Sequence, residues 1–448
     1  MNARAAGYAV FALAVAALPL VASAAGETGS PPPAPAVQTV GGTTIVQQSD
    51  ARLPLVGVEV IVRAGLDRQT LKQSGLAALV AAAILHTPVA RTANETPVPL
   101  DQAVTANGGS VRVTVDPSDV RFYVEALSTD APAVVDLFRR ALAAPDFSPS
   151  TMRAARSALM TQIAQSEQYA LQVGIDMLNA ASSSQANAGM PSLGTPASLA
   201  QLLPADAASF YRTYYRRGGS YVSAAGRLDS LDANALSQIA EALPEGDTAP
   251  VNVRVAPLHG ASREIVTHRD IASPWLIAQY DAPSVDSRDF GPMLVLAAFV
   301  KRTLTDIAQV PGVVTESLAS RAVGAVYTYD RTPARLVLYV NGGIGNPSRA
   351  FATALSVVNV LAATRLEGSI DQFKAQAAGD FATSATTLET RAWLAAVFAR
   401  DGTSPDYLER ALRAIAATTP DDVQRVARTY MGKPTIALVL PRSGNLQN

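Results

Sequence analysis

The chain contains no cysteine and only three histidines in its 448 residues. Without cysteine there can be no disulfide, no thiolate metal ligand, no cysteine nucleophile and no lipid-modified cysteine at an export cleavage site. The histidines are His86, His259 and His268, and none has a companion at metal-ligand spacing. We therefore predict no histidine-based metal site, and we interpret His86 as a helix-end residue rather than a ligand.

An excess of charge and several catalytic motifs are also missing. The 36 basic and 37 acidic residues give a net charge of −1 and form no run rich in lysine or arginine. Nucleic acid is therefore not an expected partner, because binding its phosphate backbone requires a concentrated positive surface. The sequence contains neither a GxSxG nucleophile elbow nor a glycine-rich phosphate loop, so no motif points to a serine hydrolase or a nucleotide-binding enzyme.

Hydrophobic residues are abundant, at 48 % of the chain. A chain of this length and hydrophobic content is too long for a single core and favours two packed domains. Because no disulfide is available, the stability of both domains must come from packing.

The N-terminal residues have the pattern of an export signal. Arg4 is followed by an apolar stretch over 8–22 and by the small residues Ala22, Ser23 and Ala24, which predicts a signal peptide over 1–24 and a periplasmic location. A membrane anchor would look similar, but the apolar stretch is shorter than the roughly 20 residues that cross a bilayer. We expect no stable membrane anchor after cleavage. Residues 25–37 are rich in proline, which predicts an extended spacer.

The remaining chain repeats one order of predicted elements. Residues 244–260 are polar and rich in turn formers, and they predict a linker between an N-terminal domain over 38–243 and a C-terminal domain over 261–448. In the first domain we expect strand 56–64, helix 74–85 with Ser74 as its N-cap, hairpin 110–115 and 120–127, helices within 131–182, strand 221–225 and helix 231–243. In the second we expect strands 264–268 and 275–280, helix 291–308, hairpin 325–329 and 335–341, helices up to 430 and strand 435–440.

This repetition predicts the fold class. Strand, helix, hairpin, helices and strand in both halves indicate a duplicated α+β unit, each half a mostly antiparallel β-sheet packed with α-helices. One continuous sheet is the alternative.

The same residues carry a family resemblance. The segment 61–88 resembles the pitrilysin/insulinase zinc metallopeptidases, in which a strand and loop lead to an inverted HxxEH zinc motif on a helix. Arg63-Ala64-Gly65 and Gly75-Leu76-Ala77 match that segment. The order and spacing of further landmarks extend the resemblance over nearly the whole mature chain and imply a fold like that of the mitochondrial processing peptidases. These landmarks are Gly108-Gly109, Asp119 with Tyr123, Pro145-Asp146-Phe147, Gly194-Thr195-Pro196, Phe210-Tyr211, Tyr214-Tyr215 and the segment 419–423.

The residues that the resemblance assigns to zinc are absent. Counting from Gly75-Leu76-Ala77, the two histidine positions hold Ala78 and Ala82, and the catalytic glutamate position holds Ala81. If Phe147 marks the start of the later helix, the third ligand position holds Gln162, whose amide is a poor zinc ligand. The resemblance thus implies a degenerate member that has lost its zinc, binds no cofactor and does not cleave peptides by itself.

The family also holds the substrate backbone with an arginine and a tyrosine from the second half. Here Gly324 and Tyr327 match that pattern, Ser320 takes the arginine position, and Arg321 is displaced by one residue. The resemblance therefore implies Tyr327, Arg321 and Gly324 as candidate substrate-binding residues. The alternative for Tyr327 is a packed strand residue, since tyrosine is common in strands.

Three functions remain open from the sequence. The first is a non-catalytic subunit that pairs with a zinc-bearing homologous subunit, as in heterodimeric relatives, and helps to enclose peptides. The second is a stand-alone peptide-binding or assembly protein, because strand 110–115 corresponds to the family's edge strand that accepts substrate as an added strand. Arg112 and Val113 replace the family's small pair there and would partly fill that groove. The third is a purely architectural role.

Overall fold

A computed structural model describes residues 34–182, 189–248, 263–308, 323–331, 333–341, 370–432 and 434–442. The predicted signal peptide lies outside these residues, as do His259, Ser320, Arg321 and most of the predicted linker. No helix among the described residues combines the length and the apolar character needed to cross a bilayer.

Two separate sheets form the two halves, which rules out one continuous sheet. The N-terminal sheet has the strand order β1-β2-β8-β3-β7-β6, and the C-terminal sheet has the order β11-β12-β10-β13-β9. The N-terminal strands are β1 (Ala36–Val40), β2 (Thr43–Ser49), β3 (Leu55–Val62), β6 (Gly109–Val115), β7 (Val120–Leu127) and β8 (Tyr221–Gly226). The C-terminal strands are β9 (Arg263–Arg269), β10 (Trp275–Asp281), β11 (Val323–Tyr327), β12 (Arg335–Asn341) and β13 (Thr435–Pro441).

Apart from β1, the sheets share one topology. Strands β6, β7, β3, β8 and β2 correspond in order to β11, β12, β10, β13 and β9. In each half the first four pair antiparallel, and only the last pair, β8 with β2 or β13 with β9, is parallel. The predicted duplication of an α+β unit with mostly antiparallel sheets is therefore confirmed.

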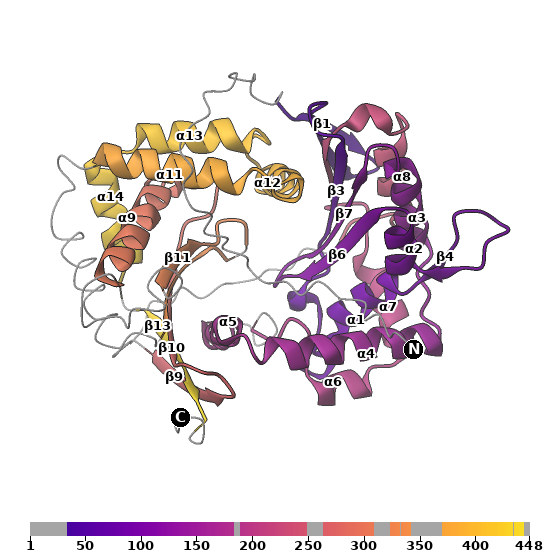
Figure 1. The fold of residues 1–448 in the computed structure, drawn as a ribbon, viewed down its shortest axis with the longest axis horizontal. Helices are drawn as coiled ribbons and strands as arrows, with labels where there is room; N and C mark the ends of the chain where they lie inside the picture. Colours follow the sequence, from indigo (N-terminus) through magenta and orange to yellow (C-terminus); the bar gives the residue numbers. More distant parts are fainter. Residues whose placement is uncertain are drawn as a thin grey trace, which may run out of the picture.

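Helices cover these sheets as Figure 1 shows, with the N-terminal half on the right and the C-terminal half on the left. The N-terminal helices are α1 (Leu76–Leu85), α2 (Leu100–Ala106), α3 (Ala131–Ala143), α4 (Pro149–Ser166), α5 (Ala170–Ser182), α6 (Pro196–Gln201), α7 (Pro204–Tyr214) and α8 (Ala235–Ala242). The C-terminal helices are α9 (Phe290–Ala308), α11 (Ile370–Ser384), α12 (Leu388–Arg400), α13 (Tyr407–Ala417) and α14 (Pro420–Tyr430). The short segments are the 3₁₀ turns η1 (Leu66–Arg68), η2 (Leu71–Gln73) and η3 (Leu228–Ser230) and the hairpin of β4 (Pro88–Val89) with β5 (Val98–Pro99).

Two corresponding helices are exchanged between the halves. Helix α12 of the C-terminal half packs on β8, β3 and β2, and helix α5 of the N-terminal half packs on the corresponding strands β13, β10 and β9. Each sheet is thus covered on one face by helices of its own half and on the other by a helix of the opposite half. This explains the run of valines in β3, since a strand covered on both faces is apolar on both.

Local predictions failed at two helix starts. Helix α1 begins after Gly75, whose φ of 89° places it in the left-handed region, so the prediction of Ser74 as N-cap was wrong. The Ser74 hydroxyl is buried without a hydrogen-bond partner, and the side chain of Gln69 instead accepts the amide of Ala77 at 3.0 Å. The helix predicted over 231–243 covers only Ala235–Ala242, after the 3₁₀ turn η3.

Candidate functional site

The helix that the resemblance assigns to zinc is fully embedded in the N-terminal core. Every residue of α1 from Leu76 to Ile84 is buried. Ala78, Ala81 and Ala82 are 1 %, 0 % and 7 % exposed and belong to the large apolar cluster between the sheet and its helices. A methyl group neither binds a cation nor accepts a proton, so these three positions offer no chemistry to a substrate.

Two glycines set the position of α1. A Cβ atom at Gly65 would collide with the backbone of Ser118 and Asp119, so the loop after β3 passes directly over the β6–β7 turn. A Cβ at Gly75 would lie 2.9 Å from the Cα of Gly194, so the start of α1 is packed against the segment before α6. Both close approaches require glycine, and they fix where α1 begins relative to the β6–β7 turn and the segment before α6.

Helix α4 faces α1 with apolar residues. Its buried apolar side chains are Met152, Ala155 and Leu159, and Ile163 continues the stripe as a partly buried member of the same cluster. Gln162, the predicted third position, is exposed and lies off this stripe. Leu159 is one of the α4 residues that belong to the same apolar cluster as the three alanines.

Two of the three histidines, His86 and His268, lie in the described part of the chain. His86 caps the C-terminal end of α1, where its backbone amide donates to the carbonyls of Ala82 and Ile84, in line with its interpretation as a helix-end residue. His268 is exposed on strand β9. Within the part of the chain that the structure describes, no three residues of the metal-ligating types come together.

Tyr327 is a packed strand residue. It ends β11, is 8 % exposed, and its hydroxyl donates to the carbonyl of Pro283. Burial strongly raises the pKa of this phenol, and the nearby Tyr329 raises it further. Gly324 is required for packing, since a Cβ there would collide with the hydroxyl of Tyr339. The position of Tyr327 favours the packing alternative over substrate contact, and Arg321 lies outside the described residues.

Strand β6 is an edge strand of the N-terminal sheet, and it is the strand that the resemblance assigns to substrate pairing. It pairs with β7 on one side, and every one of its residues is partly exposed. Arg112 forms a salt bridge of 2.8 Å with Glu389 of α12, in the other half, and its guanidinium lies over the ring of Tyr123. Val113 packs against the N-terminal core. The edge therefore keeps its backbone for pairing, while Arg112 is held by the other half.

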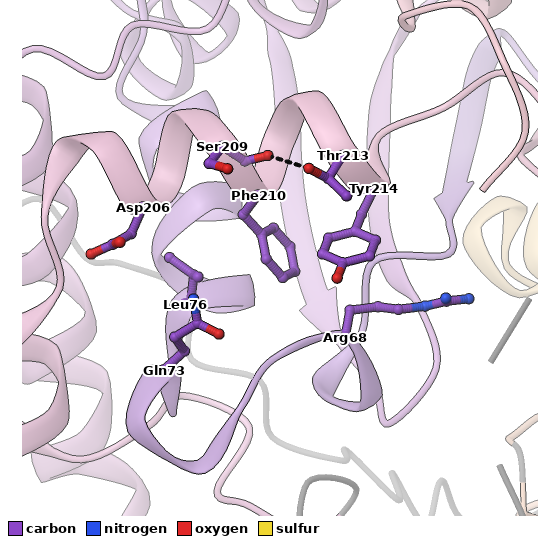
Figure 2. A pocket seen from close by; sticks show the side chains of 8 residues that line it. All are labelled: Arg68, Gln73, Leu76, Asp206, Ser209, Phe210, Thr213 and Tyr214. Atoms are coloured by element: carbon purple, nitrogen blue, oxygen red, sulfur yellow. Dashed lines mark hydrogen bonds between the residues drawn. The ribbon is translucent and has the colours of Figure 1, made fainter. Parts of the chain in front are cut away.

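A small pocket lies beside the start of α1, between η1, η2 and α7, and no sequence motif predicts it. It has a volume of about 160 Å³. Figure 2 shows Asp206 and Arg68 at opposite ends, with Leu76 and Phe210 between them. Asp206 accepts the amide of Leu203 as a helix cap, so the polar groups do not converge on one point. The lining residues are Arg68, Gln73, Leu76, Asp206, Ser209, Phe210, Thr213 and Tyr214.

Comparison with known proteins agrees with this geometry. The sequence model of the insulinase family, peptidase family M16, matches residues 44–196, which include β3, α1 and most of α4 to α6. Over these residues the chain is similar to the insulinase family. Because that match contains Ala78, Ala81 and Ala82, the resemblance to a degenerate insulinase-family member is confirmed. No curated protein matches the chain.

Solved structures extend the insulinase-like fold to the whole chain. A peptidase M16 inactive domain from Pseudomonas fluorescens has a TM-score of 0.75 at 15 % identity, covering 91 % of this chain and 98 % of that one. A protease from Helicobacter pylori has a TM-score of 0.73 at 14 % identity, covering 92 % and 100 %. A chain of complex III2 from Candida albicans has a TM-score of 0.67 at 14 % identity, covering 92 % and 97 %.

Proposed function

We propose that the chain is a non-catalytic insulinase-family subunit that pairs with a zinc-bearing homologue in the periplasm and helps to enclose and degrade peptides. The observation that carries this proposal is an intact two-sheet fold in which α1 and α4 contribute only apolar residues to the core cluster they share. Such a chain holds no zinc and acts as a pseudoenzyme, because no group remains to activate water.

The pairing is supported by the kinds of structure that share this fold. One is a peptidase M16 inactive domain, and another is a chain of complex III2 from Candida albicans. A subunit of such a pair needs an intact scaffold but not its own metal. Since Tyr327 is buried, we propose that the chain contributes the edge of strand β6 to peptide binding and does not hold the peptide with Tyr327.

Co-purification tests the pairing. The tagged protein is expressed in its native host, recovered from the periplasmic fraction, and its zinc content and peptidase activity are measured with and without the co-purified partner. We expect an equimolar zinc-bearing homologue, substoichiometric zinc in the isolated chain, and cleavage only by the pair. A protein recovered alone and monomeric contradicts pairing, and equimolar zinc in the isolated chain contradicts the loss of the metal site.

A second candidate is a stand-alone peptide-binding protein, which the partly exposed edge strand β6 favours. Backbone pairing with an added strand needs no zinc. Isothermal titration with unstructured peptides in the presence of a chelator separates this candidate from the first. Heats equal to those of dilution discard it, and saturable heat by the lone chain supports it.

A further inference from the structure

A buried carboxyl group lies at the centre of the contact between the halves. Glu59 is in the middle of β3, on the face that α12 covers, and it is 1 % exposed. Its direct neighbours on the flanking strands are Tyr123 of β7 and Ser223 of β8. The other residues of β3 from Val56 to Val62 are apolar, so Glu59 is a single acid in an otherwise apolar strand.

The carboxyl group of Glu59 is incompletely paired. Its Oε1 lies 3.5 Å from Nη1 of Arg121, while its Oε2 is buried without a hydrogen-bond partner. The hydroxyl of Ser223, on the neighbouring strand, is also buried without a partner. An ionised carboxylate with an unsatisfied buried oxygen is costly, whereas a protonated carboxyl removes most of that cost.

Arg121 does not fully neutralise Glu59, because it is closer to another acid. Its Nε is 2.9 Å from Oδ2 of Asp116, and its guanidinium lies 4.2 Å from the ring centroid of Trp393 on α12. Asp116 is also 3.7 Å from Arg331 of the C-terminal half. One cation is therefore shared between two buried carboxyl groups, with the shorter contact to Asp116.

The remaining charges around Glu59 come from α12 and β6. Glu389 of α12 repels a negative Glu59, and Arg112 of β6, which attracts it, is already paired with Glu389 at 2.8 Å. Burial raises the pKa of Glu59 to about 8, Arg121 and Arg112 oppose this shift, and Glu389 and Asp116 add to it. Asp116 differs, because Arg121 and Arg331 outweigh its burial and lower its pKa.

We propose that the contact between α12 and the N-terminal sheet is a proton-dependent latch between the two halves, closed while Glu59 is neutral and loosened when it ionises. The ends of α12 are held by separate ion pairs, Arg391 with Asp50 at 3.0 Å and Arg400 with Asp119 at 2.8 Å. Loosening therefore affects the middle of the helix, where Trp393 stacks on Arg121.

The two tryptophans of the chain make this measurable. Trp393 reports the contact of α12, and Trp275 packs in the cluster that α5 forms with the C-terminal sheet. In a Trp275→Phe variant, all tryptophan fluorescence comes from Trp393. We expect its acrylamide quenching constant to rise at least twofold between pH 6.5 and 9.5, with a midpoint near 8. A shift in emission without a change in quenching overturns the proposal, because a nearby charge alone would produce it.

Two matched variants assign the transition to one carboxyl group. Glu59→Gln with Trp275→Phe keeps the shape and remains neutral, so its quenching should stay low across the range. Glu125→Gln with Trp275→Phe alters a different acid, which lies on β7 and accepts a hydrogen bond from the hydroxyl of Tyr123. The quenching of this variant should change with pH as in the parent. A Glu59→Gln variant that titrates like the parent overturns the proposal. If this variant does not fold, the parent titration still decides, since an unchanged quenching constant overturns the latch.

Discussion

Arg391 of α12 and Asp50, which follows β2, form a buried ion pair across 341 positions of the chain. Nη1 of Arg391 lies 3.0 Å from Oδ2 of Asp50, and their side chains are 7 % and 4 % exposed. Nε of Arg391 also donates to Gln48 at 3.2 Å. These bonds fix the first turn of a helix from one half on the sheet of the other.

Arg391→Ala should therefore destabilise the whole chain. Removing one partner of a buried pair costs roughly 3–5 kcal/mol, and we expect the lower end, about 3 kcal/mol, because Asp50 keeps its bonds from Arg52. Urea unfolding followed by circular dichroism measures the loss. The control is Arg413→Ala, which removes an exposed pair with Glu409 and should change stability by less than about 0.5 kcal/mol. Equal effects of both variants would contradict the importance of the exchanged helix.

Glu59→Gln should change how stability depends on pH. In the folded chain the pKa of Glu59 is about 8, above the ordinary value of 4.5. Between these values the unfolded chain has lost a proton that the folded chain keeps, so the free energy of unfolding falls as pH rises, by at most about 1.4 kcal/mol per pH unit. Glu59→Gln lacks this pH dependence, so its free energy of unfolding relative to the wild type should increase from pH 5 to 8. Denaturant titrations at pH 5, 6.5 and 8 measure the difference, and parallel curves would refute the raised pKa.

Restoring the zinc motif should require Leu159 rather than Gln162. Ala78→His, Ala81→Glu and Ala82→His together should bind no stoichiometric zinc and should lose roughly 1–3 kcal/mol for each enlarged buried side chain. Adding Leu159→Glu completes a ligand set from the buried stripe of α4, whereas adding Gln162→Glu places the carboxylate outside it.

Metal analysis after dialysis, with thermal unfolding of each variant, checks this prediction. Equimolar zinc in the variant that carries Gln162→Glu, and none in the variant that carries Leu159→Glu, would show that the third ligand position is 162 and not 159.

Two helical glycines should respond differently to alanine. A Cβ at Gly174 of α5 would lie 2.5 Å from Cδ1 of Ile277 in the C-terminal sheet, whereas Gly379 of α11 has no such neighbour within 4 Å. Gly379→Ala should stabilise the chain by about 1 kcal/mol through helix propensity. Gly174→Ala should gain less or lose stability, because Ile277 must move. Thermal unfolding compares the two, and equal gains would mean that α5 does not pack tightly on β10.

Much of the fold was predictable because its signals are local. The hairpin of β6 and β7 follows from alternating residues on either side of a turn, and α1 follows from an uninterrupted run of helix formers. The N-cap of α1 was not predictable in this way. Ser74 is a common cap residue, but the contact of Gly75 with Gly194, more than a hundred positions later, requires a glycine at the cap itself.

The candidate site was likewise predictable only in part from the sequence. Counting from Gly75, the sequence alone places Ala78, Ala81 and Ala82 at the positions that the resemblance assigns to the zinc motif. Gln162 and Leu159 lie on different faces of α4, and only packing shows which face meets α1. The hydroxyl of Tyr327 likewise finds its partner in Pro283, which no spacing rule connects to it.

By itself, the sequence determined the element order, the duplicated α+β unit and the alanines at the positions that the resemblance assigns to zinc, since these depend on residue identity and on periodicity within short segments. Only the tertiary structure decided that α5 and α12 are exchanged between the halves, and that Glu59 and Arg391 therefore become buried. Burial of a charge depends on what covers it, and here the covering helix comes from more than 300 residues away.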